Sequence, residues 1–248
     1  YNGWLGQRLL FEPEDVVMCP LPLFHVFAAY PILMSMIASG AHVVFPTPAG
    51  YRGEGVMDNL WKLVERWRCT YLITVPTALA ALMQRPIDAD ISSLKNAFSG
   101  SSPLPVELYN RFKKETGIEI VEGYGLTEAT CLVSINPPDG VKKIGSVGCI
   151  FPYTTVRILT KQGATHFREC AVDEVGEICI SNPGVYEGST YTEADKKIGD
   201  THQVVQDGKK FTIQKKEATD GTQAPQAQQA TQEGSQAPGA AEPVTAKT

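Results

Sequence analysis

Short β-rich runs alternate with helix-length segments over the first half of the chain. Two strands joined by such a helix run parallel, because the helix carries the chain back to the edge where the first strand began. The alternation therefore predicts an α/β fold: a parallel sheet flanked by helices on both faces. The β-rich runs are residues 42–46, 70–75, 94–98 and 118–121.

Helical periodicity predicts that the segments between these runs, at residues 57–67, 78–84 and 106–116, are helices. An earlier apolar segment, residues 26–38, is also predicted to be a helix, ending at Gly40. In the 57–67 segment, apolar side chains recur every three or four residues, and we expect this face to pack in the core. Its members are Met57, Leu60, Trp61, Val64 and Trp67.

Composition divides the chain into four predicted regions. Residues 1–145 form the α/β core, and residues 146–196, with β-rich runs and no long helix, form a smaller, mostly antiparallel β segment. Residues 197–217 are a remnant or an extension. Residues 218–248 are rich in Ala, Gln and Pro and cannot bury enough apolar surface to offset the entropy cost of ordering, so this tail is predicted to be disordered.

Charge and cysteine content exclude several classes of function. The net charge of −5 offers no basic surface for nucleic acid. The six cysteines are scattered, with no C-x-x-C pair, which indicates reduced thiols in a cytoplasmic protein, most of them small core residues. No apolar run is long enough to span a membrane.

Two predicted loops follow neighbouring strands and have sequences that suit a ligand. Residues 99–105 read SGSSPLP, and residues 122–128 read EGYGLTE. Ligands of open parallel sheets bind beyond the carboxyl ends of the strands, so we expect the two loops to share one cleft.

The second loop has the residue types of a nucleotide and metal site. Gly123 and Gly125 let a ligand approach the main chain, and Tyr124 offers a flat face for a nucleobase. Thr127 begins a predicted helix, whose free N–H groups favour phosphate. Glu128 would repel bare phosphate, but a bridging Mg²⁺ removes that conflict. A glycine turn with a helix cap, and no ligand, would explain the same residues.

Six motifs in order resemble the adenylate-forming superfamily of acyl-CoA synthetases, luciferases and peptide-synthetase adenylation domains. The resemblance covers residues 1–192, and the combination looks most like bacterial fatty-acid–CoA ligases. The motifs are PLFHVFA (22–28), ITVPTALAALM (73–83), LKNAFSGSSPLPVEL (94–108), GYGLTEAT (123–130), KIGSVG (143–148) and GEICISNPGVYEG (176–188).

The resemblance implies part of an N-terminal AMP-binding domain and a two-step reaction. A carboxylate attacks ATP to form acyl-AMP and pyrophosphate, and coenzyme A then displaces AMP to form a thioester. ATP, Mg²⁺ and coenzyme A are the implied cofactors and substrates. The implied partner is a small carboxylic acid, a fatty acid or a similar one.

The resemblance also implies roles for single residues. Tyr124 would stack on adenine, Thr127 would contact the α-phosphate, and Glu128 would hold Mg²⁺. His25 would lie at the mouth of the acyl pocket, although a histidine at the start of an apolar helix is more often a packing residue. Asp200, in KIGD, is the candidate ribose ligand. The adenine and acyl carbonyl region would be lined by Gly100, Ser101 and Ser102, and the acyl pocket by residues 73–83.

Three parts of the family pattern are not recognisable in the sequence. They are the Gly/Ser/Thr-rich phosphate loop expected before Tyr1, the small C-terminal domain with its lysine, and a complete ribose motif. We therefore expect that this chain is incomplete and does not finish the thioester reaction alone. Two alternatives stay open: a nucleotide- or acyl-binding module without turnover, and a non-catalytic scaffold.

Overall fold

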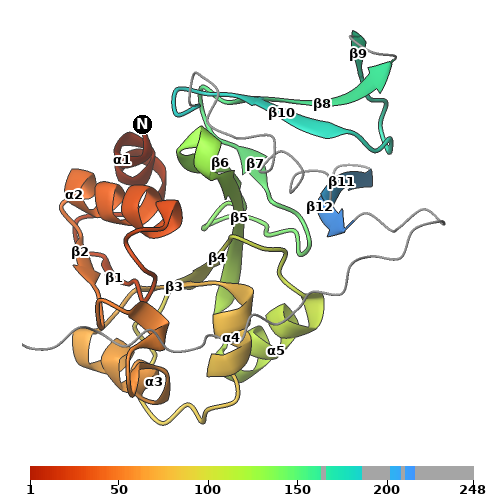
Figure 1. Cartoon of the computed structure of the whole chain (residues 1–248). Helices are drawn as coiled ribbons and strands as arrows, with labels where there is room; N and C mark the ends of the chain where they lie inside the picture. The colour runs from red at the N-terminus through yellow and green to blue at the C-terminus, as the bar shows by residue number, and fades with distance from the viewer. Residues whose placement is uncertain (163–165, 186–201, 208–209, 216–248) are drawn as a thin grey trace, which may run out of the picture. The chain divides into compact units, whose positions relative to one another are not determined.

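The computed structural model describes residues 1–162, 166–185, 202–207 and 210–215 (Figure 1). Asp200 and the predicted tail, residues 218–248, lie outside this set. By their contacts, residues Tyr1–Lys216 belong to one compact unit. Among the described residues, none of the helices combines the length and the apolar character that a membrane span requires.

Seven strands form the main sheet, in the order β2-β1-β3-β4-β5-β6-β7. The first five in this order run parallel, and β6 and β7 run antiparallel to their neighbours. The predicted α/β fold with a largely parallel sheet is confirmed. The strands are β1 (Val16–Met18), β2 (His42–Val44), β3 (Tyr71–Thr74), β4 (Asn96–Ser99), β5 (Glu119–Leu126), β6 (Cys131–Ile135) and β7 (Cys149–Ile150).

Helices lie on both faces of this sheet, as predicted (Figure 1). One face is covered by α3 (Val56–Trp67), α4 (Pro76–Leu82) and α5 (Val106–Thr116). The other is covered by α1 (Asn2–Leu5), η1 (Gly6–Leu10), η2 (Ala28–Met34) and α2 (Ser35–Ser39). Two short helical turns are also present, η3 (Gly50–Arg52) and η4 (Thr127–Ala129).

The strand side chains divide between two hydrophobic clusters. Leu72 and Ala97 pack in the cluster of α3, α4 and α5, whereas Tyr71, Ile73 and Phe98 pack in the cluster of α1, η1, η2 and α2. Successive side chains of a strand point to opposite faces, so a strand covered on both sides has to be apolar at every position. This explains why the predicted strands read as continuous apolar runs.

Helix α3 matches its predicted bounds, but its apolar face is not buried throughout. Leu60, Trp61 and Val64 are buried. Trp67 is 42% exposed, and its ring packs edge-on against His42, with centroids 5.7 Å apart. The prediction that Trp67 belongs to the core is wrong, because it lies beside β2 at the edge of the sheet. For the same reason the predicted buried strand at 42–46 is exposed at its start.

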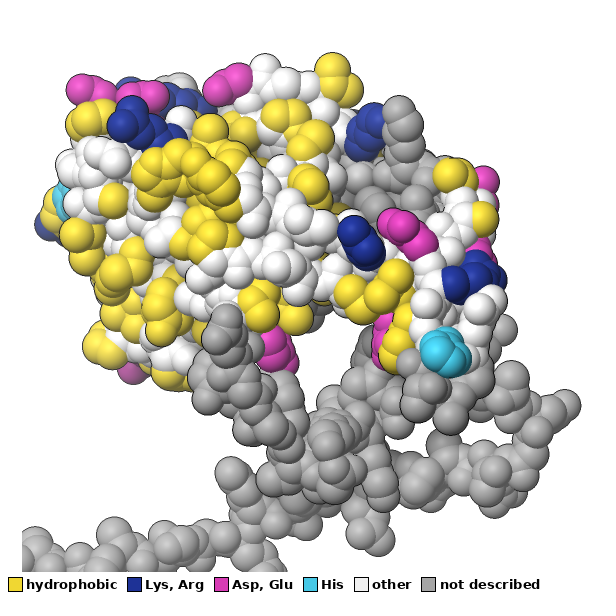
Figure 2. Space-filling model, turned by 90° about the horizontal axis from the view of Figure 1, so that it is seen from above, with side chains coloured by type: hydrophobic (Ala, Val, Ile, Leu, Met, Phe, Trp, Pro, Cys, Tyr) yellow, Lys and Arg dark blue, Asp and Glu magenta, His cyan; other side chains and the backbone are white. Residues whose placement is uncertain are grey.

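The predicted helix at residues 26–38 is present as η2 and α2 and ends at Gly40, which adopts the left-handed conformation (φ 74°). Pro31 lies inside it, where the wide turns of η2 accommodate a residue that has no N–H to donate. Residues 16–51 contain no Asp, Glu, Lys or Arg. The outer face of this helical layer is accordingly apolar, as Figure 2 shows, with Trp4, Leu9, Tyr30, Met34 and Ile37 exposed.

Strand β5 differs most from prediction. The strand expected at 118–121 does not end before the Gly-Tyr-Gly segment but continues to Leu126. The predicted helix at Thr127 is only the three-residue turn η4, after which β6 returns antiparallel to β5. The predicted loop and helix are therefore wrong. Tertiary pairing is the reason: β6 supplies a hydrogen-bonding partner that holds residues 123–126 extended.

The predicted antiparallel β segment is confirmed as a sheet with the order β10-β8-β9. Its strands are β8 (Thr155–Gln162), β9 (His166–Glu169) and β10 (Glu177–Ser181). The sequence analysis missed a hairpin of β11 (His202–Asp207) and β12 (Lys210–Lys215). Its signal was Asp-Gly at 207–208 between two β-rich runs, a common hairpin connection.

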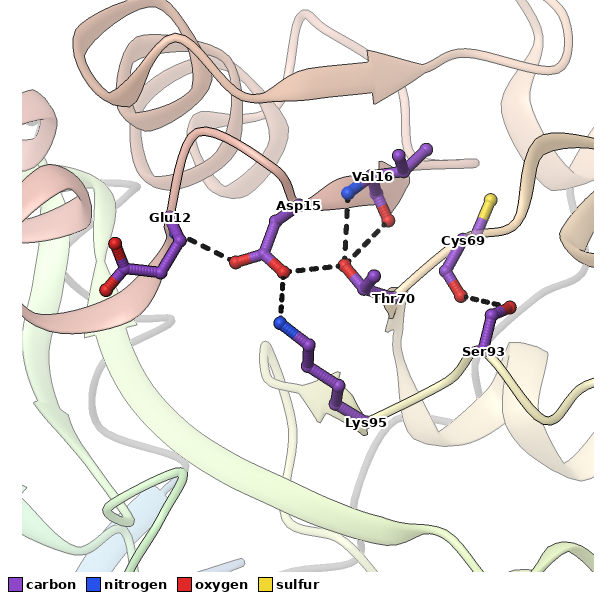
Figure 3. Close-up of polar contacts among 7 residues, drawn as sticks. All are labelled: Glu12, Asp15, Val16, Cys69, Thr70, Ser93 and Lys95. Carbon is purple, nitrogen blue, oxygen red and sulfur yellow. Dashed lines mark hydrogen bonds and ion pairs between the residues drawn. The ribbon is translucent and has the colours of Figure 1, made fainter.

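A network of polar side chains lies at the amino ends of three central strands (Figure 3). Asp15, Thr70 and Lys95 each directly precede a strand, β1, β3 and β4. The buried Asp15 carboxylate accepts hydrogen bonds from Glu12 N–H (2.8 Å), the Thr70 hydroxyl (2.9 Å) and Lys95 Nζ (2.6 Å). Val16 N–H donates to Thr70 Oγ1 at 3.0 Å. The network fixes the starts of neighbouring strands relative to one another.

All six cysteines are free, as expected. Cys19, Cys69 and Cys131 are buried, and burial raises the pKa of each thiol to about 12. Cys149 and Cys179 are exposed, and Cys170 is half-buried. Half of the cysteines are thus core residues, rather than most of them.

Candidate active site

A cavity of about 290 Å³ opens at the carboxyl ends of β4 and β5, where the sequence predicts a shared cleft. It is bounded by the end of η1 and the residue after it, by residues 25–32, by the end of β4 and by both strands of the β5–β6 pair. Its lining residues are Leu10, Phe11, His25, Val26, Phe27, Pro31, Ile32, Phe98, Ser99, Gly100, Ser101, Val121, Gly123, Tyr124, Gly125, Leu126, Thr127, Glu128, Cys131, Leu132 and Ile135.

The segment after β4 contributes main chain to the cavity. Of the three residues predicted for the adenine and acyl carbonyl region, Gly100 and Ser101 line this cavity, whereas Ser102 is exposed and does not. Ser101 has φ +69°, a left-handed conformation that is uncommon for a residue with a side chain. The Ser99 hydroxyl is buried and has no hydrogen-bond partner among the residues that the structure describes. Ser99 was not among the predicted site residues, although it belongs to the predicted cleft loop, residues 99–105.

The Gly-Tyr-Gly segment lines the cavity from β5. Gly125 permits a close approach of β6, because a Cβ at this position would lie 1.7 Å from the Cys131 carbonyl oxygen. The pairing register shifts between Tyr124 and Gly125, which indicates a bulge. Bulges re-aim side chains and are common beside functional sites. Burial raises the pKa of the Tyr124 hydroxyl, and the Glu128 charge adds to this shift.

The turn η4 places Thr127 and Glu128 at the cavity. After it, Thr130 and Cys131 have φ values of 50° and 83°, two successive left-handed residues. The turn is held from outside: Asn2 Nδ2 donates to the Thr130 carbonyl at 2.8 Å, and the Thr130 hydroxyl donates to the Gly184 carbonyl. Such conformations persist only where surrounding contacts hold them.

One carboxylate, that of Glu128, lines the cavity, and the described residues contain no cluster of three or more metal-ligating side chains. A magnesium ion here would therefore draw most of its ligands from phosphate oxygens and water, which is a usual arrangement for this ion. No Lys or Arg is among the lining residues of the described chain.

His25 lines the cavity and is exposed. Its Nδ1 accepts a hydrogen bond from Phe27 N–H at 3.2 Å, which leaves Nε2 as the protonated nitrogen of the neutral ring. Beyond it the wall is apolar, formed by Phe27, Pro31 and Ile32. The segment 73–83, expected to line the acyl pocket, does not border this cavity.

A second cavity of about 280 Å³ lies between the β5–β7 strands and the small antiparallel sheet. Tyr124 borders both cavities. Its cross-strand partner Ser134 also lines the second one, as do Arg157 and Cys170. The β5–β6 pair therefore has a cavity on each side, with Tyr124 at the boundary.

Comparison with solved structures defines the class of fold. The ATP-bound MatB structure from Rhodopseudomonas palustris aligns with a TM-score of 0.70 at 24% sequence identity, covering 86% of this chain and 42% of that one. A likeness at this level of identity establishes the fold.

Sequence comparison defines the family. The family model described as AMP-binding enzyme matches residues 1–189. The chain belongs to this family. It is 37% identical to the marinolic acid–CoA ligase of Pseudoalteromonas sp. (strain SANK 73390), over 72% of this chain and 29% of that protein. It is 31% identical to the long-chain-fatty-acid–CoA ligase of Bacillus subtilis (strain 168), over 81% and 34% respectively. The chain thus spans about a third of the length of these relatives.

Proposed function

We propose that this chain is the adenylate-binding part of an ATP-dependent carboxylate–CoA ligase. One observation carries the proposal: a single cavity joins the 100–101 segment, the Gly-Tyr-Gly strand and the Thr127–Glu128 turn with an apolar wall. An acyl adenylate is divided in the same way as the cavity: it has a charged phosphate and a sugar at one end and an apolar chain at the other.

The polar side of the cavity would bind the nucleotide part. We propose that Tyr124 stacks on adenine and that Thr127 contacts the α-phosphate. Glu128 would hold Mg²⁺, which when bound would neutralise phosphate charge during adenylation. Coenzyme A would then accept the acyl group from AMP. The expected ribose ligand, Asp200, lies outside the described residues.

The apolar side would bind the acid. Phe27, Pro31 and Ile32 offer no hydrogen-bonding side chains, so they suit an alkyl chain, and we propose a fatty acid or a similar carboxylic acid as the substrate. The names of both relatives reported above specify acids that are joined to coenzyme A. His25, at the mouth, would lie beside the reacting carboxylate. We also propose a cytoplasmic location, in keeping with six free cysteines.

The direct test is equilibrium binding of AMP and of a non-hydrolysable fatty-acyl-AMP analogue to the purified chain. We expect both to bind, the analogue more tightly because it also fills the apolar side. Failure of both to bind at millimolar concentration would contradict the proposal.

A substitution of His25 tests the division of the cavity. His25→Ala should leave AMP affinity unchanged and weaken the acyl-AMP analogue about threefold to tenfold, since only the analogue reaches the mouth. Exposed Phe24→Ala, one residue earlier and outside the lining, is the matched control. An equal loss for AMP would place His25 on the nucleotide side.

Binding without turnover is the second candidate, and the absence of Lys and Arg from the described lining favours it. Pyrophosphate carries several charges that adenylation must neutralise together, and removing one preorganised donor from such a site costs roughly 10²–10³ in rate. We expect no multiple-turnover pyrophosphate release from this chain with ATP, Mg²⁺ and fatty acids. Release that Glu128→Ala abolishes would show that the chain is itself catalytic.

A further inference from the structure

Glu122 is a buried carboxylate that the proposed function leaves unused. Its residue is 7% exposed, and it lines neither cavity. It lies where β5 changes partners: Glu122 is the last residue paired with β4, opposite Ser99, and Gly123 is the first paired with β6. At this point β4 ends and the chain leaves the sheet as the segment 100–105.

Both ends of that segment lie beside Glu122. At the start, Ser99 is its partner in the parallel register. At the end, Leu104 N–H donates to Glu122 Oε1 at 3.0 Å. Between these two points lie Gly100 and Ser101, which line the cavity. Ser101 has the left-handed φ of +69°, a conformation that needs support from its surroundings.

The main chain of Glu122 is held in turn by Asn136. The Glu122 carbonyl accepts from Asn136 N–H at 2.9 Å and from Asn136 Nδ2 at 3.1 Å. The same amide donates to the Ser146 carbonyl at 2.6 Å and accepts from Lys143 N–H at 2.9 Å. Asn136 is buried and uses its side-chain amide fully. The main chain of Glu122 is therefore held in place, which limits how far its carboxylate can follow a displaced loop.

Burial raises the pKa of Glu122, and the Leu104 N–H is the group that lowers it. In either protonation state a carboxyl oxygen remains to accept from Leu104 N–H. A buried N–H without an acceptor is costly, so the contact determines where the loop can lie.

We propose that Glu122 is a positioning residue: it holds the 100–104 loop against β5 and so sets the distance between the Gly100–Ser101 main chain and the Tyr124 strand. The inference rests on the proposed function for its consequence in ligand binding. Its structural part, the Leu104 N–H contact, can be measured without any ligand.

The first measurement is amide hydrogen exchange by NMR on the chain labelled in leucine. In the unsubstituted chain we expect the Leu104 amide to exchange at least about tenfold more slowly than the exposed amides of Ser101 and Ser102, measured on a uniformly labelled sample. An unprotected Leu104 amide would overturn the inference without any variant.

Variants separate positioning from general stability. Glu122→Gln retains an oxygen acceptor, and Glu122→Leu does not. We expect Leu104 exchange to accelerate about tenfold or more in Glu122→Leu and to stay within about threefold of the original rate in Glu122→Gln. The Leu72 amide, in central strand β3, reports on opening of the whole sheet and should stay unchanged relative to the original chain.

We expect AMP affinity to change in the same order as Leu104 exchange, more in Glu122→Leu than in Glu122→Gln. AMP affinity should fall about tenfold in Glu122→Leu, which corresponds to about 1.4 kcal/mol, and stay within about threefold in Glu122→Gln. Glu119→Leu is the matched control, because it makes the same change three residues earlier on β5, where the carboxylate meets Lys113 and Lys142 instead of the loop. It should not alter Leu104 exchange.

Three outcomes would overturn the positioning role. They are unchanged Leu104 exchange in Glu122→Leu, equal acceleration at Leu72 and Leu104, and a Gln variant that behaves like the Leu variant. If the unsubstituted chain binds neither AMP nor the acyl-AMP analogue, the proposed function is contradicted, and the exchange data still decide whether Glu122 holds the loop.

Discussion

The polar groups at the amino ends of the parallel strands differ from those beside the cavity, at the carboxyl ends, in whether they have hydrogen-bond partners. At the amino ends, Asp15 is almost wholly buried and its carboxylate accepts three hydrogen bonds, two of them from Thr70 and Lys95 (Figure 3). At the carboxyl ends, Ser99 is equally buried, yet its hydroxyl has no partner in the described part of the chain. Glu128 and His25 face a cavity instead of an opposing charge.

The difference shows which end serves stability and which serves ligands. Buried polar groups that satisfy one another hold strands together and leave nothing for a ligand to bind. Buried polar groups without partners destabilise the free protein, and a ligand can offset this by supplying the missing hydrogen bonds. Removing a polar group at the amino ends should therefore change stability, whereas removing one that faces the cavity should change binding more than stability.

The largest effect is expected at Asp15. Asp15→Ala leaves Glu12 N–H without its acceptor, removes the partner of Lys95 Nζ and leaves the Thr70 hydroxyl only its longer contact with the Val16 carbonyl, 3.3 Å. It should lower the free energy of unfolding by about 3 kcal/mol. Urea denaturation measures this change. Asp88→Ala, which breaks the exposed pair with Lys62, is the control and should cost less than about 1 kcal/mol. Equal losses would remove the distinction between the buried network and a surface pair.

Gly125→Ala should be the most damaging small change at the other end. A Cβ there meets the Cys131 carbonyl oxygen, so β5 and β6 must separate, at a cost of about 2 kcal/mol, and the cavity changes shape. Both the melting temperature and AMP binding should fall. Gly123→Ala is the matched control, since its Cβ would lie 3.3 Å from its nearest neighbours and should fit with little shift. Similar losses in the two variants would mean that the close approach at Gly125 is not needed.

Glu128→Gln should affect binding without affecting stability. We expect Mg²⁺-ATP to bind about tenfold more weakly and metal-free AMP to change less than about twofold, because the lost charge acts through the cation. Isothermal titration with and without magnesium measures both. Equal losses in the two conditions would exclude a metal-binding role.

The smallest effect should come from removing one hydroxyl at each end. Thr70→Val deletes a hydroxyl that contacts Asp15 and Val16 and should cost about 1 kcal/mol. Ser99→Ala deletes a buried hydroxyl without a partner and should change stability by less than about 0.5 kcal/mol, or improve it. Thermal denaturation of both variants compares them directly. If Ser99→Ala were the more damaging, the Ser99 hydroxyl would have a partner, and the contrast between the two ends would fail.

Local sequence was sufficient where one element decides its own structure. The helices α3 and α5 and the alternation of helices with the strands β2, β3, β4 and β5 follow from periodicity, because an amphipathic helix between two apolar runs has few ways to bury its face. The place of β1 between β2 and β3 was not predicted. Glycine and motif patterns likewise indicated several of the residues that line the cavity, including Gly100, Tyr124 and Glu128.

Tertiary structure decided what depends on a distant partner. Residues 123–126 are extended because β6 pairs with them, and Trp67 is exposed because β2 lies at the edge of the sheet. The role of Glu122 is of the same kind. Its sequence neighbours do not explain why a carboxyl group is buried at this position, since its partner, Leu104 N–H, is 18 residues away. Hydrogen bonds between segments depend on how the chain returns on itself, and no local pattern records that.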